Sequence, residues 1–382
     1  MKDNYLPLPG SVLFESLKDK NCIIMATNVR VVPGVMKGIF RAARDSNSAL
    51  IVEIARSEAN LEKGYTGMTP HQYAEAARKT AREVGHDIWA LHADHITVKK
   101  GTPEDIEATK KLIAAQVEAG FTSFAIDASY LYDFKGKDLK EELQLNINAT
   151  TELALFLKKK MGSKPFGLEV EVGEIGKEDE HGRVLTKPEE AVVFISELNK
   201  NGVYPHLLAI ANGTAHGNVY DAQGNLIEDI TIDIPQTKAV AKALKDNGFD
   251  VRIAQHGITG TPRDKIASMF PKGVILKGNV ATFWQNLVFD TLKLYEPELY
   301  KEIWDWVIEN FKKPGKKDVE IFGKNAKFAT GHFIKEISNM SEEAEKAIEA
   351  RAYAEALLFF QAFGTYGTGS VVRKYLKVKE ER

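Results

Sequence analysis

Histidines follow three separate apolar segments of this sequence, and one of them is preceded directly by a carboxylate. Asp94 and His95 end the segment LHADH, His216 lies in NGTAHG, and His256 lies in QHGITG. Three imidazoles that leave one coordination position open are typical of a catalytic zinc-type site rather than a closed structural site. We therefore expect His95, His216 and His256 to hold a divalent metal, provided that the fold brings the three segments together.

A single histidine at the end of a strand is more often a hydrogen-bonded core or surface residue than a metal ligand. The expectation of a metal centre therefore depends on all three histidines converging on one place. Five of the other histidines lack this placement and are expected to have no metal-binding role: His71, His86, His181, His206 and His332.

Carboxylates near these histidines could transfer protons or support the metal. At the end of a strand, Asp94 could reach over a bound substrate and act as a general acid/base. Glu169 and Glu171 are two residues apart, so they share one face of an extended strand. If that face is buried, the two carboxylates need a cation or a hydrogen-bond network, and one of them could equally pair with a buried Lys or Arg.

The elements that would position these residues alternate between short apolar segments and amphipathic helices. Thr69-Pro70, Thr102-Pro103 and Thr261-Pro262 each combine an N-cap residue with a proline suited to the first helical position. Helical periodicity covers 70–84, 103–119, 139–160, 188–199 and 237–246. Strands are expected at eight segments: 22–27, 49–54, 88–92, 122–127, 166–172, 207–211, 251–255 and 274–277.

Eight βα units predict an α/β fold, a closed (β/α)8 TIM barrel, rather than an open doubly wound sheet. No G-x-G-x-x-G pattern follows the first strand, which argues against a dinucleotide-binding fold. From about Thr282 the sequence becomes helical and charged. We expect residues 1–284 to form the catalytic barrel and residues 285–382 to form a helical C-terminal extension packed on it. Active sites of such barrels lie at the carboxyl ends of the strands, where the histidines and carboxylates fall.

Composition restricts the class of partner. The chain has 51 Lys and Arg against 53 Asp and Glu, a formal charge of -2, which gives no electrostatic reason to expect nucleic acid or an anionic membrane as partner. No segment resembles a signal peptide, and no apolar run approaches the roughly 18 residues that a transmembrane helix requires. We expect a cytoplasmic protein that acts on small molecules.

The motifs LHADH, DAS, LEVEVGEIGKED, NGTAHG and QHGITG, spread over residues 20–286, resemble those of the class II fructose-bisphosphate aldolases and the wider ketose-bisphosphate aldolase superfamily. The resemblance implies that the three histidines bind the metal and that Asp94 handles the proton on the hydroxyl where the carbon–carbon bond breaks. It also makes Asp127 and Glu171 candidates for binding the metal at an alternative position or for supporting the metal ligands through hydrogen bonds. Glu178, in the Glu-Asp pair of the family's mobile loop, would exchange the proton on the nucleophilic carbon, with Glu180 as the alternative.

The resemblance also implies a substrate-binding set. Asn28 matches a substrate-binding asparagine, and HGITG retains Gly257, Thr259 and Gly260 as backbone donors to a phosphate. After the last strand, where the family pattern resembles N-V-[ND]-T, the chain reads Lys277-Gly278-Asn279-Val280. Lys277 could serve there as a point charge for phosphate. Gly217 and Asn279 complete the set.

The expected activity is reversible aldol cleavage of a phosphorylated ketose, with fructose 1,6-bisphosphate giving dihydroxyacetone phosphate and glyceraldehyde 3-phosphate. Zinc is the expected metal, and a homo-oligomer is the expected assembly. Two departures keep alternatives open. Ala55 stands where the family has a serine, which Arg56 or Ser57 could replace, and GYTGMTP resembles accessory subunits of tagatose-bisphosphate aldolases and related sugar-acid epimerases. The alternatives are a metal-dependent epimerase and a non-catalytic partner subunit.

Overall fold

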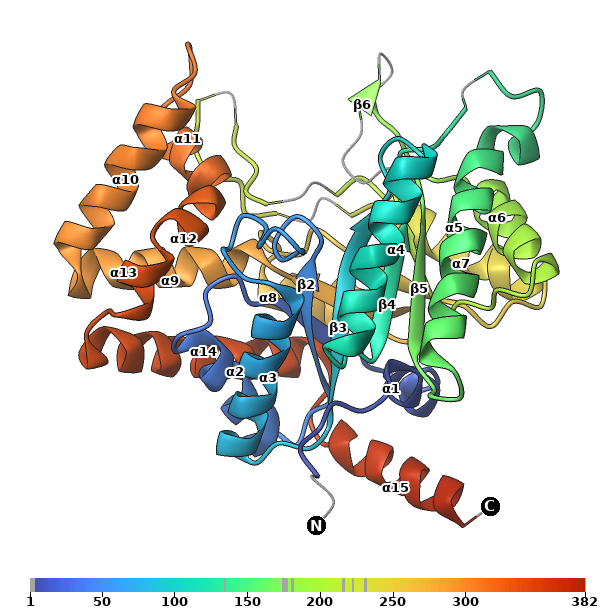
Figure 1. The fold of residues 1–382 in the computed structure, drawn as a ribbon, viewed down its shortest axis with the longest axis horizontal. Helices are drawn as coiled ribbons and strands as arrows, with labels where there is room; N and C mark the ends of the chain where they lie inside the picture. The colour runs from blue at the N-terminus through green and yellow to red at the C-terminus, as the bar shows by residue number, and fades with distance from the viewer. Residues whose placement is uncertain are drawn as a thin grey trace.

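The structure is a computed structural model that describes residues 4–133, 135–173, 178–179, 182–214, 217–221, 223–229 and 232–381. Eight parallel strands close into a barrel in the order β1-β10-β9-β8-β5-β4-β3-β2 (Figure 1). Each predicted segment overlaps one of them, although β1, β2, β3 and β10 extend past the predicted ends, and the predicted TIM barrel is confirmed. The strands are β1 (Ile24–Asn28), β2 (Leu50–Ala55), β3 (Trp89–Thr97), β4 (Ser123–Asp127), β5 (Gly167–Val172), β8 (Leu207–Ile210), β9 (Arg252–Gln255) and β10 (Ile275–Val280).

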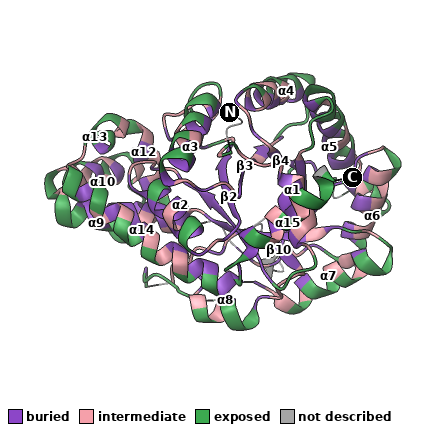
Figure 2. Cartoon of the chain, turned by 90° about the horizontal axis from the view of Figure 1, so that it is seen from below, coloured by how far each residue is buried: buried purple, intermediate pink, exposed green. Residues whose placement is uncertain are grey.

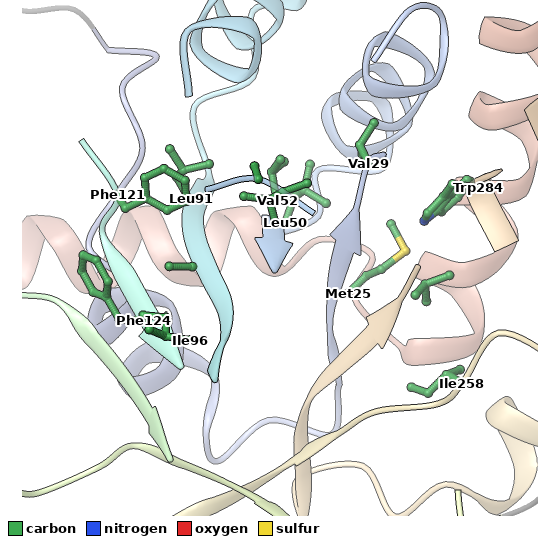
Figure 3. Close-up of a cluster of buried hydrophobic side chains, with 14 of the residues drawn as sticks. Met25, Val29, Leu50, Val52, Leu91, Ile96, Phe121, Phe124, Ile258 and Trp284 are labelled. Atoms are coloured by element: carbon green, nitrogen blue, oxygen red, sulfur yellow. The ribbon is translucent and has the colours of Figure 1, made fainter. Parts of the chain in front are cut away.

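The strands are buried on both faces because one face packs inside the barrel and the other packs against helices. Outward residues such as Met25, Val52 and Leu91 belong to the large core between the strands and the surrounding helices (Figure 3). Inward residues such as Ile24 and Ala26 form a second core with side chains of α1 (Gly10–Leu17). Helix α1 therefore closes the amino-terminal end of the barrel, the end seen in Figure 2.

The helices that surround the barrel follow the sequence signals closely. They are α2 (Val35–Asp45), α3 (Pro70–Val84), α4 (Pro103–Glu118), α5 (Leu139–Met161), α6 (Pro188–Lys200), α7 (Ile234–Asp246) and α8 (Arg263–Met269). Thr69 and Thr102 cap α3 and α4 by accepting hydrogen bonds from backbone N–H groups, as predicted.

The third predicted cap is wrong. Helix α8 begins at Arg263, and Pro262 rather than Thr261 is its N-cap residue. The backbone N–H of Thr261 donates instead to the carbonyl oxygen of Ile258 at 2.8 Å. Thr261 therefore closes a turn after β9, and the helix starts one residue later than the Thr-Pro pair indicated.

Helices also follow the last strand, as predicted. They are α9 (Thr282–Tyr295), α10 (Pro297–Phe311), α11 (Asp318–Asn325), the 3-10 turn η1 (Ala326–Phe328), α12 (Ala329–His332), α13 (Ile334–Ser338), α14 (Glu342–Phe363) and α15 (Thr368–Glu380). The expected boundary between residues 284 and 285 falls inside α9, and the division into two domains stays a prediction. Among the described residues, no helix has the length and apolar character needed to span a membrane.

Helix α14 returns to the barrel and lies against α2 (Figure 1). Gly38 on α2 makes this close approach possible. A Cβ atom at that position would lie 2.4 Å from the carbonyl oxygen of Glu349 and 2.8 Å from the Cβ of Ala352, both on α14. Because Gly38 has no side chain, α14 can pack directly against α2 on the barrel wall.

Candidate active site

A β-bulge near the carboxyl end of β3 sets the geometry of the site. The pairing of β3 with β4 shifts register between Ala93 and Ile96, and His95 has a positive φ of 36°. In a regular strand, adjacent side chains point to opposite faces, so Asp94 and His95 could not share a pocket. The bulge changes the direction of one side chain relative to the other, and both residues line the same cavity. A positive φ at a non-glycine residue is uncommon and is typical of functional sites.

Asp94, His95 and His256 form a group whose potential ligand atoms all lie within 4.8 Å of one another. The rings of His95 and His256 have centroids 4.4 Å apart. A second group, with the same spacing, contains His95, Asp127 and Glu171. The structure therefore brings two of the three predicted histidines together with three predicted carboxylates. His216 lies outside the described residues.

Carboxylates of β4 and β5 contact the two imidazoles. Glu171 Oε2 lies 3.1 Å and Asp127 Oδ2 lies 3.4 Å from His95 Nδ1. Glu169 Oε1 lies 3.1 Å from His256 Nε2. Glu169 and Glu171 share one face of β5, as predicted, and each contacts a different histidine. Metal-binding histidines commonly bond a carboxylate through the ring nitrogen that does not bind the metal. The donor set therefore fits a divalent metal, which Nε2 of His95 and Nδ1 of His256 would hold.

Asp94 is held by two amides from neighbouring strands. Asn28 Nδ2 donates to Asp94 Oδ2 at 3.0 Å, and Asn279 Nδ2 donates to Asp94 Oδ1 at 3.3 Å. Burial alone would raise the pKa of Asp94, but the charges of His95 and Lys277 hold that pKa well below its ordinary value. Asp94 is thus an ionised carboxylate with a fixed orientation, which suits a proton acceptor.

The cavity above these groups has a volume of about 320 Å³. Its position at the carboxyl ends of the strands is the one expected for the active site of a barrel. It brings together most of the predicted site residues: Asn28, Asp94, His95, Asp127, Glu171, Gly217, His256, Gly257, Thr259 and Asn279.

Lys277 is not among the residues that line the cavity. Its side chain is fully buried, with Nζ 3.0 Å from Glu53 Oε2 and 2.8 Å from Glu169 Oε2. Lys277 and Asn279 are two residues apart on β10, so both point inward, but Lys277 lies one layer deeper. One of the two inward glutamates, Glu169, therefore pairs with a buried lysine, which was the alternative left open by the sequence.

The predicted loop carboxylate belongs to a short hairpin after β5. Strands β6 (Glu178–Asp179) and β7 (Gly182–Arg183) pair antiparallel, with Glu178 opposite Arg183 (Figure 1). The side chain of Glu178, and all of Glu180, lie outside the described residues. The proton-transfer role assigned to Glu178 stays a prediction.

Two cationic residues that line the cavity, Arg30 and Lys327, were missed by the sequence analysis. Arg30 Nε donates to Glu58 Oε1 at 2.6 Å, and its Nη1 donates to Thr282 Oγ1 at 3.1 Å. Glu58 also accepts a hydrogen bond from Asn28 Nδ2 at 3.0 Å. Arg30 lies two residues after the end of β1, and Glu58 lies three residues after the end of β2. Their positions near strand ends could therefore have marked both as candidate site residues.

Lys327 is the second missed cation, and it comes from η1 in the C-terminal helices. Its ammonium lies 5.9 Å from the centroid of the Tyr65 ring. Burial, together with the nearby charge of Arg30, lowers the pKa of Lys327. No carboxylate of the described residues lies within 4 Å of it, whereas Arg30 is paired with Glu58. No sequence signal connects residue 327 with the barrel mouth.

The two residues proposed to replace the family serine differ in position. Ser57 lines the cavity. Arg56 instead points along the barrel wall, where its Nη1 donates to the carbonyl oxygen of Thr97 at 2.5 Å and to Thr109 Oγ1 at 2.8 Å. Of the two, only Ser57 is placed to contact a substrate.

Comparison with known proteins identifies relatives of this chain. Residues 11–350 match the family described as Fructose-bisphosphate aldolase class-II. A fructose-bisphosphate aldolase from Corynebacterium glutamicum is 24% identical over 329 residues, 84% of this chain and 88% of that protein. A D-tagatose-1,6-bisphosphate aldolase subunit, GatZ, from Escherichia coli O157:H7 is 30% identical over 103 residues, 25% of this chain and 24% of its own. A solved fructose-bisphosphate aldolase from Campylobacter jejuni shares the fold, with a TM-score of 0.58, 19% identity, and coverage of 95% and 97%.

The metal centre gives the first testable prediction. Purified protein should retain about one divalent ion per chain after dialysis, and His95→Ala should lose it because one imidazole of the centre is removed. Elemental analysis measures this directly. His71→Ala is the matched control, since His71 is exposed on α3 and should not change metal content. Equal metal content in wild type and His95→Ala would contradict the assignment.

Proposed function

The chain belongs to the class II fructose-bisphosphate aldolase family, a metal-dependent aldehyde-lyase family that acts on sugar phosphates, and on that premise we propose that it cleaves fructose 1,6-bisphosphate reversibly. The products would be dihydroxyacetone phosphate and glyceraldehyde 3-phosphate. Zinc is the proposed metal, in keeping with a centre built from imidazoles and carboxylates.

The observation that carries this proposal is the position of Asp94. One of its carboxylate oxygens lies within 4.8 Å of a ring nitrogen of each of His95 and His256, and Asp94 also lines the cavity that would hold the substrate. A bound divalent ion would act as a Lewis acid that stabilises negative charge developing on substrate oxygens. Asp94, held by Asn28 and Asn279, would accept the hydroxyl proton as the carbon–carbon bond breaks.

A phosphate site is proposed at the glycine-containing turns beside the metal centre. Gly217 and Gly257 line the cavity with φ values of 82° and 70°, a backbone conformation that residues with a Cβ rarely adopt. Such turns can direct backbone N–H groups towards an anion. Thr259 and Asn279 would add side-chain donors, so the phosphate of the nucleophilic half would bind next to the metal.

Arg30 and Lys327 are proposed to meet the other end of the substrate. Both line the cavity, and the two cations flank the ring of Tyr65. Because Arg30 is already paired with Glu58, Lys327 supplies the surplus positive charge. A ketose with a phosphate at each end would place one phosphate at the glycine turns and the other at this wall.

A screen of phosphorylated ketoses and sugar acids tests the proposed reaction. Metal-loaded protein alone should release triose phosphates from fructose 1,6-bisphosphate, detected by coupled dehydrogenase assays. Release only from tagatose 1,6-bisphosphate would change the substrate to the one in the GatZ relative's name. Deuterium incorporation from solvent without triose release would favour an epimerase. No reaction unless a second protein is added would favour a partner subunit.

The two proposed proton-transfer groups should have separable effects. Asp94→Ala should abolish cleavage while exchange of the α-proton on bound dihydroxyacetone phosphate persists, because exchange is assigned to Glu178. Glu178→Ala should suppress that exchange, and either loss should be roughly 10²- to 10⁴-fold. Proton exchange is followed by NMR in deuterated buffer. Glu180→Ala is the matched comparison, and normal exchange in Glu178→Ala with lost exchange in Glu180→Ala would move the role.

Lys327→Met should weaken substrate binding more than it slows chemistry. Losing a charge-assisted contact with a remote phosphate should raise KM roughly 10- to 100-fold with little change in kcat. Steady-state kinetics measures both parameters. Lys324→Met is the matched control, because Lys324 pairs with Glu320 one turn earlier on the same helix, α11, and does not line the cavity. Equal KM values for the two variants would exclude Lys327 from the substrate site.

A further inference from the structure

A network of charged side chains lies inside the barrel beneath the proposed metal centre. Lys277 is the only lysine of this network among the residues that the structure describes. The ammonium of Lys277 is fully buried and lies 3.0 Å from Glu53 Oε2, 2.8 Å from Glu169 Oε2 and 3.8 Å from Asp94 Oδ1. It also lies 3.2 Å from His92 Nε2. One cation therefore contacts three carboxylates that come from three different strands.

The contacts of Glu169 connect this cation to the metal site. Glu169 Oε2 accepts the hydrogen bond from Lys277, while Glu169 Oε1 lies 3.1 Å from His256 Nε2. The two oxygens of one carboxylate thus join the ammonium on one side and a proposed metal ligand on the other. On a separate path, Lys277 faces Asp94, the proposed proton acceptor, without an intervening group.

A buried lysine among carboxylates could serve charge balance alone, and replacing such a network with apolar residues often costs little stability. Charge balance alone, however, does not require Lys277 to contact these two particular carboxylates: Glu169, which orients His256, and Asp94, the proposed proton acceptor. Both contacts are present, and each fixes a group whose direction matters for catalysis.

We propose that Lys277 is a positioning residue of the metal centre. It holds Glu169 against His256, and it fixes the orientation of Asp94 beside the metal that His256 would bind. It touches neither the substrate nor the metal. This assignment replaces the phosphate-binding role expected from the sequence, and it rests on the metal centre of the proposed function.

Cobalt binding to purified, metal-free protein tests this role without relying on activity. Lys277→Met alone would leave Glu53 and Glu169 buried without their cation, so the main variant is Lys277→Met/Glu53→Gln, which removes one charge of each sign. Its affinity for Co²⁺, titrated through the visible absorption bands, should fall roughly 10- to 100-fold, with an altered spectrum. Glu53→Gln is the matched control and should bind Co²⁺ as the wild type does, because Glu53 contacts neither His95 nor His256 in the described structure. Lys277→Gln/Glu53→Gln is a second variant, which also removes one charge of each sign but keeps a donor for Glu169, and it should recover part of the affinity.

Thermal unfolding of the metal-free proteins verifies that the variants fold. Folded variants with wild-type Co²⁺ affinity and spectrum would overturn the positioning role and leave the proposed aldolase reaction untouched. Wild-type protein that bound no Co²⁺ would overturn the metal centre itself, and this inference with it. If Lys277→Met/Glu53→Gln does not fold, the comparison of Lys277→Gln/Glu53→Gln with wild type decides in the same way.

Discussion

The site depends on one backbone irregularity, the bulge that lets consecutive residues Asp94 and His95 face the same cavity. A left-handed conformation at a non-glycine residue costs about 1–3 kcal/mol and persists only where surrounding contacts maintain it. Here, amides of β1 and β10 hold the carboxylate, and carboxylates of β4 and β5 hold the imidazole. The contacts that orient Asp94 and His95 therefore also stabilise the strained backbone between them.

Three layers fill the barrel beneath and around this bulge. The lowest is apolar, where α1 packs against inward side chains of the strands. The next is ionic, and Glu53 and His92 are neighbours in the β2–β3 register, with Lys277 beside both. The uppermost holds the metal donors and the cavity. Removing charges from water is costly, so the ionic layer is stable only because each carboxylate has a nearby cation or hydrogen-bond donor.

The sequence was sufficient for the architecture and for most of the site. Near-continuous apolar segments define strands buried on both faces, and a barrel places the carboxyl ends of all strands at one mouth, so residues such as Asn28 and His256 could be assigned by position. The sequence did not predict how far below the mouth of the barrel each inward side chain lies. Lys277 and Asn279 share an inward face, and only the closed barrel shows that one is buried among carboxylates while the other reaches the cavity.

Lys327 shows a different limit, because its place depends on packing between segments far apart in the chain. The 3-10 turn that carries it lies against the loop after β2, where Phe328 meets the Tyr65 ring edge-on with centroids 5.6 Å apart. Gly331 permits this approach, since a Cβ there would lie 2.3 Å from the carbonyl oxygen of Tyr65. The C-terminal helices thus form part of the cavity wall, and the barrel supplies the metal centre. Under the proposed function, the barrel would carry the reaction chemistry, and the C-terminal helices packed on it would contribute to recognition of the remote end of the substrate.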